Sequence, residues 1–356
     1  GVAVDEVHAV QAGLAEHAAV ARLIARDRFR DTPGSRLLTG LRGKDVLLVF
    51  IESYGKVAVQ GSALSRGVDA VLARGDAQLR AEGYQSRSAF LTSPTFGGLS
   101  WLAHSTMQSG VRVDGQRTYN QVIRSNRLTL TAAFKRAGWR TVADVPMVDR
   151  SWGAASSFYH YDKVYDLNNL GYRGPAFGLP PMPDQYAFLA LQRKELAKRH
   201  RKPLFAEIDT TSSHAPWTVI PRLIPWNRVG NGYVYYGLPA EESTKAAIFG
   251  DTHRARVEYG NSIQYSLNTL FSFVRRYGNR NTVLIVLGDH QPHTFVTGLG
   301  ASHDVPVSVI AHDAKVIDRI AGWGWQDGLK PGPRAPVWPM QAFRDRFLGA
   351  FSSAPR

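Results

Sequence analysis

The sequence predicts an α/β protein with a mostly parallel central sheet that is sandwiched by helices. Two apolar runs, residues 46–51 and 282–287, lack the polar alternation of a half-exposed strand, so both suit strands that helices cover on both faces. A helical pattern at 255–277 leads into the second run. The 356 residues, 44% of them hydrophobic, can build a sizeable core. We also expect a small α+β subregion near the C-terminal end.

The other elements follow from their patterns and from turn residues. We predict an N-terminal amphipathic helix over 5–30 that lies against the main domain or leads out of a membrane. Residues 1–43 are then a helical segment and linker, and 44–356 form one domain. The remaining expectations are helices at 64–79, 100–110, 128–137, 184–199 and 337–351, and strands at 87–91, 140–145, 203–209 and 305–311.

Composition limits the possible chemistry and partners. The chain has no cysteine, which excludes disulfides, thiolate metal sites and cysteine nucleophiles, so a metal must be held by oxygen and imidazole. Lys and Arg exceed Asp and Glu by 43 to 29, a net charge of +14, which favours anionic partners such as phospholipid headgroups or wall polymers. The alternative is that this charge only aids solubility. No basic helix with interleaved aromatic residues is present, so we expect no nucleic-acid partner.

Three titratable residues follow the two buried strands. Glu52 follows the strand 46–51, and Asp289 and His290 follow 282–287 after Gly288. The carboxyl ends of parallel strands form the ligand crevice of such sheets, and a buried carboxylate is costly unless it is neutralised. We therefore predict metal ligands. The alternatives are a helix-capping or arginine-paired Glu52, and a loop carboxylate beside a surface histidine.

Ser100 is predicted at the amino terminus of the helix 100–110, after the turn residues Gly97 and Gly98. Serine is a favoured helix cap, but the same position gives a nucleophile and an anionic phosphoryl group the positive end of the helix dipole. His104 comes one turn later on the same face, where it donates to a substrate oxygen or packs in place.

Further candidates come from loops after predicted strands. Asp209 ends the strand 203–209 and His214 follows it, and both are candidate metal or substrate ligands. His303 can add an imidazole to the same crevice. Taken together, Glu52, Ser100 and the Asp289–His290 pair make one oxygen and nitrogen site. A divalent cation there favours the serine alkoxide and neutralises charge on a transferring phosphoryl group.

In order and spacing, these short motifs resemble the sulfatase-like branch of the alkaline phosphatase superfamily. The matching stretches are Glu52-Ser53, Gly98-Leu99-Ser100, Ser213-His214 and Gly288-Asp289-His290. Within that branch, residues 44–312 look most like the extracellular domain of lipoteichoic acid synthase and other phosphoglycerol transferases.

This resemblance implies a site and a reaction. Glu52, Ser100, Asp289 and His290 would bind one divalent metal, Mn²⁺ first and Zn²⁺ or Mg²⁺ as alternatives. Ser100 would replace a threonine nucleophile, and His214 would contact substrate. Trp152 matches a substrate-pocket tryptophan, but Ala154 stands where an arginine is expected, which leaves the headgroup open.

We therefore expect a metal-dependent phosphotransferase that forms a phosphoserine on Ser100. It would move a phosphoglycerol-type headgroup from an anionic phospholipid to an envelope glycan or polymer. His214, His104, Trp152, Asp209 and His303 are the predicted substrate-binding residues. The chain would act as a monomer outside the cytoplasm, at the cell surface or in the periplasm, tethered to a membrane in the full-length protein.

Three alternatives remain at this point. One is a hydrolase of the same superfamily, a phosphodiesterase or phosphatase. A two-metal form would draw on Asp209, His214, His293 and His303. Another is a non-catalytic member that binds an anionic glycan or lipid. Sulfate-ester hydrolysis is not expected, because the residues after Ser100 lack the proline and arginine of the formylglycine motif.

Overall fold

The computed structural model describes residues 1–238 and 242–353. Within this part of the chain, nine strands form one sheet in the order β4-β3-β5-β1-β6-β7-β2-β8, and β9 also pairs with β2. The strands are β1 Asp45–Ile51, β2 Gln85–Thr92, β3 Arg140–Val145, β4 Lys163–Asp166, β5 Leu204–Asp209, β6 Thr282–Gly288, β7 Asp304–Ala311, β8 Gln326–Asp327 and β9 Val337–Pro339.

The predicted mostly parallel sheet is confirmed. β1 pairs in parallel with β5 and β6, and β3 pairs in parallel with β4 and β5. β7 runs antiparallel to both β6 and β2. The C-terminal strands β8 and β9 join the same sheet at β2. The helix predicted over 337–351 is therefore wrong at its start, because 337–339 pair with β2 and the helix begins at Phe343.

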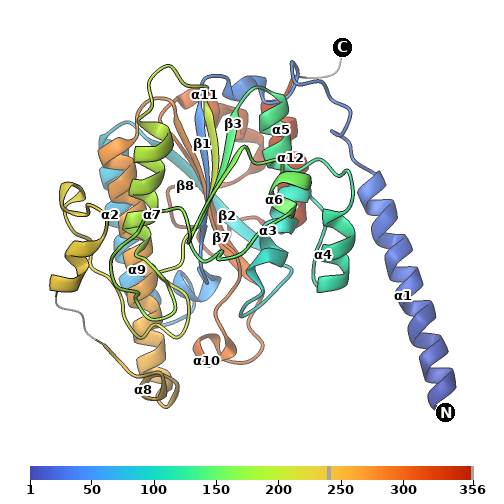
Figure 1. Ribbon diagram of the computed structural model, residues 1–356, viewed down its shortest axis with the longest axis horizontal. Coiled ribbons are helices and arrows are strands. Elements are labelled where there is room, and N and C mark those ends of the chain that lie inside the picture. Colours follow the sequence, from blue (N-terminus) through green and yellow to red (C-terminus); the bar gives the residue numbers. More distant parts are fainter. Residues whose placement is uncertain (239–241, 354–356) are drawn as a thin grey trace.

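Helices cover both faces of the sheet (Figure 1). One layer contains α2, α7 and α9, and the other contains α3, α5, α11 and α12. The helices are α1 Val2–Ala25, α2 Ser65–Ala81, α3 Ser100–Ser109, α4 Gln116–Ile123, α5 Leu130–Arg136, α6 Ala154–Ser157, α7 Asp184–Leu191, α8 Lys245–Phe249, α9 Thr252–Tyr277, α10 Thr294–Thr297, α11 Ala314–Arg319 and α12 Phe343–Phe351. A π-helical segment, Gln192–Leu196, continues α7.

β6 shows why its sequence is apolar throughout. Leu284 and Val286 pack in the core beneath α2, α7 and α9, whereas Val283, Ile285 and Leu287 pack in the core on the opposite face. Successive side chains of a strand point to opposite faces, and here both faces are buried. Every residue of β1 and β6 is buried, so side chains just past their ends enter a crevice in the interior.

α1 has two parts with different surroundings. Val20 and Ile24, near its C-terminal end, are buried against the body. Val7, Val10 and Leu14 are exposed, and this half of the helix projects away from the rest of the molecule (Figure 1). No helix in the described ranges combines the length and the hydropathy that crossing a bilayer requires.

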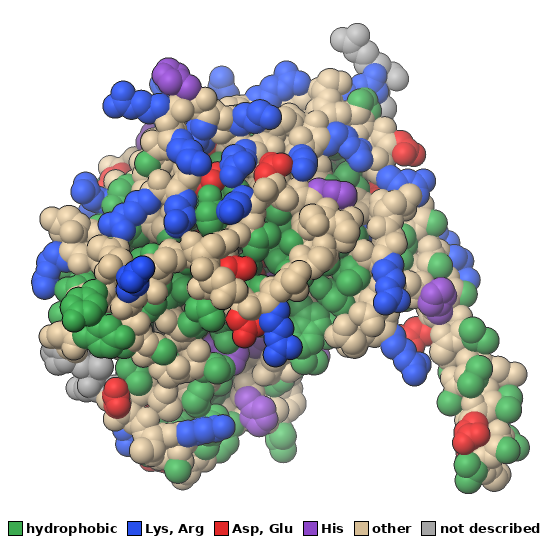
Figure 2. All heavy atoms as spheres, in the orientation of Figure 1, with side chains coloured by type: hydrophobic (Ala, Val, Ile, Leu, Met, Phe, Trp, Pro, Cys, Tyr) green, Lys and Arg blue, Asp and Glu red, His purple; other side chains and the backbone are tan. Residues whose placement is uncertain are grey.

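Basic side chains gather along the upper edge of the molecule in Figure 2. Arg140, Lys198, Arg201 and Lys202 line a hollow together with two acidic residues. Arg140 begins β3 and Leu204, in the same hollow, begins β5. This basic region therefore lies at the amino ends of the parallel strands, away from the crevice at their carboxyl ends.

A buried ion cluster joins the segment after α1 to α12. Asp27 contacts the Arg344 guanidinium at 2.8 Å, and neither side chain has exposed surface. Asp27 also accepts from the Leu128 backbone N–H at 2.8 Å and lies 3.9 Å from Arg127. Burial acts to raise the pKa of Asp27, but the hydrogen bond and charge of Arg344 outweigh it and lower the pKa.

We expect Asp27→Asn to lower the free energy of unfolding by about 3 kcal/mol at pH 7, because it removes the buried carboxylate next to Arg127 and leaves Arg344 with only the partly exposed Asp345 among the described carboxylates. The native pKa is lowered, so this stabilisation is full above the unfolded value of about 4 and is lost as pH falls through the native value. Urea unfolding at several pH values measures it. Asp31→Asn, at an exposed pair, is the control, and equal stability of the two variants would contradict the expectation.

Candidate active site and metal centre

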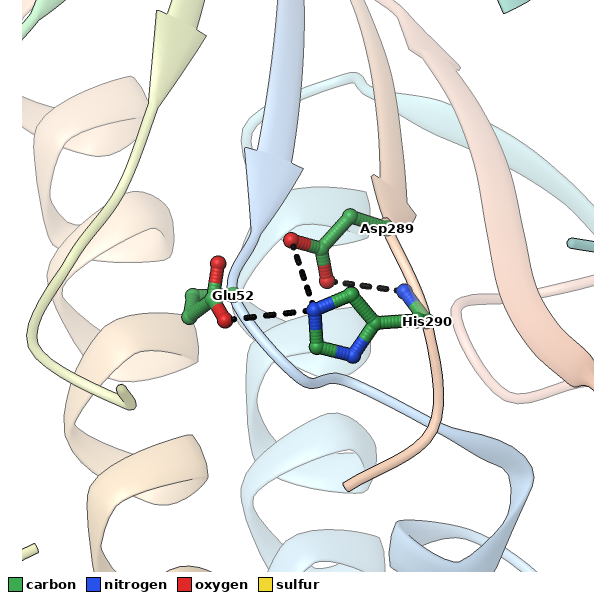
Figure 3. Close-up of side chains that lie close together, drawn as sticks. All are labelled: Glu52, Asp289 and His290. Carbon is green, nitrogen blue, oxygen red and sulfur yellow. Dashed lines mark hydrogen bonds and ion pairs between the residues drawn. The ribbon is translucent and has the colours of Figure 1, made fainter. Parts of the chain in front are cut away.

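The pairing of β1 with β6 brings the predicted metal ligands together. Ile51 at the end of β1 is the register partner of Gly288 at the end of β6, so Glu52 and the Asp289–His290 pair follow at neighbouring strand ends. His290 Nε2 lies 3.4 Å from Glu52 Oε1 and 3.5 Å from Asp289 Oδ2. Figure 3 shows the three side chains converging on one point.

Gly288 allows this approach. A Cβ atom at this position would lie 1.7 Å from the Tyr54 carbonyl oxygen, which no side chain permits. The loop after β1 therefore crosses directly over the end of β6. Within this loop the Ser53 backbone N–H donates to Asp289 Oδ1 at 2.8 Å, as does the His290 backbone N–H. These two bonds fix the Asp289 carboxylate and leave its second oxygen directed elsewhere.

Ser100 is the first residue of α3, and its hydroxyl points into the same cluster. The preceding residue, Leu99, has a left-handed backbone (φ 61°), and no side chain caps this helix end. Instead, Ser100 Oγ lies 3.2 Å from Glu52 Oε2 and 3.2 Å from His290 Nε2. The alternative role of Ser100 as a helix cap therefore does not apply.

These four side chains fit a divalent cation. Their closest separations are 3.2–3.5 Å, and bonds of about 2.0 Å in a tetrahedral site place ligand atoms about 3.3 Å apart. Asp289 Oδ2 is buried and has no hydrogen-bond partner among the described residues. Such orphaned buried oxygens are rare. Oxygen ligands with one imidazole suit Mn²⁺ and Zn²⁺.

The electrostatics of the cluster also call for positive charge. Burial and the charge of Glu52 raise the pKa of Asp289 to about 8. Burial opposes the protonated form of His290, but the charges of Asp289 and Glu52 outweigh it and raise the pKa of His290 to about 10. Burial likewise acts to raise the pKa of Glu52, but the charge and hydrogen bond of His290 outweigh burial and hold this pKa below its usual range. The raised pKa values of Asp289 and His290 favour protons at this cluster, and a bound cation would supply the same positive charge.

His214 lies beside the cluster on the loop after β5. Its charge helps to lower the pKa of Glu52. The His214 Nδ1 atom is 2.6 Å from the Ala215 carbonyl oxygen, and because a carbonyl oxygen only accepts, Nδ1 donates this bond and Nε2 takes no part in it. The same loop is tied to the site, because Ser213 Oγ donates to the Glu52 carbonyl oxygen.

His104 and Asp209 pair with each other. His104 Nδ1 lies 3.4 Å from Asp209 Oδ2, and the His104 ring packs on Phe50 with a centroid distance of 4.2 Å. Sequence reasoning missed Glu207, whose ligand oxygens lie in the same group. The sequence did contain a signal for Glu207, because it is a carboxylate inside an otherwise apolar strand. It lies two residues before Asp209 and therefore on the same face of β5.

The other predicted substrate residues lie at the rim or in packing. His303 is exposed, and its Nδ1 atom is 3.2 Å from the carbonyl oxygen of Ser93, a residue that donates to the Asp289 carbonyl. His293 uses Nδ1 to accept the Phe295 N–H at the start of α10. Trp152 is half-buried and packs on Tyr159 and Tyr161.

We expect Gly288→Ala to weaken Mn²⁺ binding at least tenfold, because the new methyl group displaces the loop that carries Ser53 away from Asp289. Overpacking of this kind costs about 1–3 kcal/mol of stability. Calorimetric titration and thermal melting measure both effects. Gly98→Ala is the matched control, since its Cβ meets nothing within 4 Å. Unchanged affinity in Gly288→Ala would show that this close approach is not needed.

Comparisons with known proteins place the fold. No protein-family model and no curated protein sequence matches the chain. Solved structures do match it. The lipoteichoic acid synthase LtaP from Listeria monocytogenes is 14% identical, with a TM-score of 0.54, over 88% of this chain and 73% of that one. An alkaline phosphatase superfamily protein from Vibrio parahaemolyticus is 14% identical, with a TM-score of 0.53, over 95% and 75%.

A third similar structure is the soluble domain of lipooligosaccharide phosphoethanolamine transferase A from Neisseria meningitidis. It is 16% identical with a TM-score of 0.54, and the match covers 90% of this chain and 92% of that one. At such identities the likeness concerns the fold. The mixed sheet between two helical layers, with polar residues at the ends of β1, β5 and β6, is thus an alkaline phosphatase-like fold.

Proposed function

We propose that the protein is a metal-dependent phosphotransferase with Ser100 as its nucleophile. The observation that carries this proposal is the Ser100 hydroxyl, which lies 3.2 Å from both Glu52 and His290 at the amino terminus of α3. That end of a helix attracts anionic groups such as a phosphoryl group. A cation held by Glu52, Ser100, Asp289 and His290 would favour the serine alkoxide and neutralise phosphoryl charge.

The proposed reaction has two steps. In the first, Ser100 Oγ loses its proton and attacks phosphorus, an Oγ–P bond forms, and the bond from phosphorus to the leaving alcohol breaks. The leaving alkoxide takes up a proton. In the second, the oxygen of an acceptor hydroxyl attacks the phosphoserine, its proton leaves, and Ser100 recovers a proton as the Oγ–P bond breaks. Nε2 of His214 is free to accept or donate a proton at a substrate oxygen.

The proposed donor is an anionic phospholipid with a phosphoglycerol-type headgroup, and the proposed acceptor is an envelope glycan or polymer. The similar structures include a lipoteichoic acid synthase and a phosphoethanolamine transferase, which supports this class. Trp152 and His303 are proposed substrate contacts at the rim. The first turn of α1 lies toward the same end of the molecule as α10, the helix that follows His290 (Figure 1). This arrangement suits a site that faces a membrane outside the cytoplasm.

We expect Ser100→Ala to retain Mn²⁺ binding but to lose at least about 10³-fold in headgroup release from phosphatidylglycerol vesicles, because no nucleophile remains. Ser100→Thr should restore a measurable fraction. Ser105→Ala, in the same helix with its hydroxyl on the Leu102 carbonyl, is the matched control. Mass spectrometry of the wild type should find the phosphoglycerol adduct on Ser100.

Several outcomes separate the proposal from its alternatives. Release of free glycerol phosphate at the same rate with and without acceptor alcohol would identify a hydrolase. Turnover of phosphatidylethanolamine in place of phosphatidylglycerol would change the headgroup only. Full activity of Ser100→Ala, or no turnover of either lipid or of a chromogenic phosphodiester by the metal-loaded wild type, would refute the proposal.

A further inference from the structure

A second group of metal-ligating side chains lies beside the first. It consists of His104 on α3 and Glu207 and Asp209 on β5, and one ligand atom of each lies within 4.8 Å of the other two. Glu207 and Asp209 share a face of the strand, and His104 is one helical turn beyond Ser100. The charges of Glu52 and His290 both act on the pKa of His104, so the two groups are neighbours.

Two polar atoms of this group are buried without partners. His104 Nε2 and Asp209 Oδ1 have no hydrogen bond to any described residue. A different pair of atoms, His104 Nδ1 and Asp209 Oδ2, lies 3.4 Å apart, so the two side chains face each other while Nε2 and Oδ1 stay without a partner in the described part of the chain. A packed interior does not normally keep such atoms unsatisfied, so the arrangement points to a missing ligand.

The third member is held in place by its surroundings. Glu207 is 2% exposed, and Gln108 Nε2 donates to Glu207 Oε1 at 3.2 Å. The Gln108 amide is itself fixed, since its nitrogen donates to Thr131 Oγ1 and its oxygen accepts from the Thr131 backbone N–H. Partners of this kind orient carboxylate ligands around metals.

The protonation states agree with this geometry. Burial lowers the pKa of His104 to about 4, so the imidazole is neutral and has a lone pair to offer. Burial raises the pKa of Glu207 to about 7. Burial and the charge of Glu207 raise the pKa of Asp209 well above its usual value. Both shifts mean that two negative charges are unfavourable at this place unless positive charge lies nearby.

We propose that His104, Glu207 and Asp209 bind a second divalent cation, of the Zn²⁺ or Mn²⁺ type, next to the site formed by Glu52, Ser100, Asp289 and His290. His104 and Asp209 then act as ligands of this cation and do not contact substrate directly. The proposal does not depend on phosphotransfer, because occupancy can be measured with no substrate present. It also selects ligands that differ from His293 and His303, the loop histidines available from sequence.

The test is metal stoichiometry. Full-length protein freed of metal with a chelator is titrated with Zn²⁺, and separately with Mn²⁺, by calorimetry, and bound metal is counted after gel filtration. The wild type should bind two equivalents of at least one of them. His104→Gln/Asp209→Asn should bind one, Glu52→Gln/Asp289→Asn should bind one, and the combined variant none. His8→Gln/His17→Gln, at exposed histidines of α1, should still bind two.

The retained equivalent in each double variant shows that it is folded, and far-ultraviolet circular dichroism checks the combined one. One equivalent in the wild type, kept by His104→Gln/Asp209→Asn, would overturn the proposal and leave a proton-sharing carboxyl pair. Two equivalents that both persist in that variant would overturn it as well. Neither result bears on Ser100 as the nucleophile, so the two proposals fail independently.

Discussion

Two buried carboxylates held side by side set the terms for the rest of the molecule. Parallel pairing of β1 and β6 ends both strands at the same level, and Glu52 and Asp289 follow them into an interior crevice. Their mutual repulsion at low exposure has to be offset by positive charge. The imidazole of His290 and the hydroxyl of Ser100 lie beside this pair, and the backbone N–H of Ser53 donates to Asp289, so the oxygen and nitrogen atoms gathered here could hold a cation.

The scaffold secures each contributor from a different direction. Gly288 admits the loop after β1, and that loop brings Ser53 to Asp289. The loop after β5 is bound to the backbone of Glu52 through Thr210 and Ser213. A left-handed Leu99 turns α3 so that its first residue faces inward. Functional groups on rigid, mutually bonded elements of this kind need little rearrangement to act.

Local patterns were enough to predict the sheet and the meeting of Glu52, Ser100, Asp289 and His290 at one point. Apolar runs identified β1 and β6, and the glycines around Ser100 identified both ends of α3. Long-range pairing was less accessible, because a short strand such as β9 takes its conformation from β2 and not from its own residues. The partnership of His104 with Asp209 and Glu207 depends on how α3 crosses β5, which no spacing in the sequence encodes.

The length of α1 sets the distance between the crevice and any partner that binds the first turn of this helix. Its 24 residues, at about 1.5 Å each, make a rod about 36 Å long. Val20 and Ile24 pack against the core at the C-terminal end of α1, and Arg127 donates to the carbonyl oxygens of Leu23 and Arg26 at the same end. The helix is therefore a rigid extension of the body and not a flexible tether. A partner that binds the exposed first half of this helix would therefore fix both the distance and the angle between itself and the crevice.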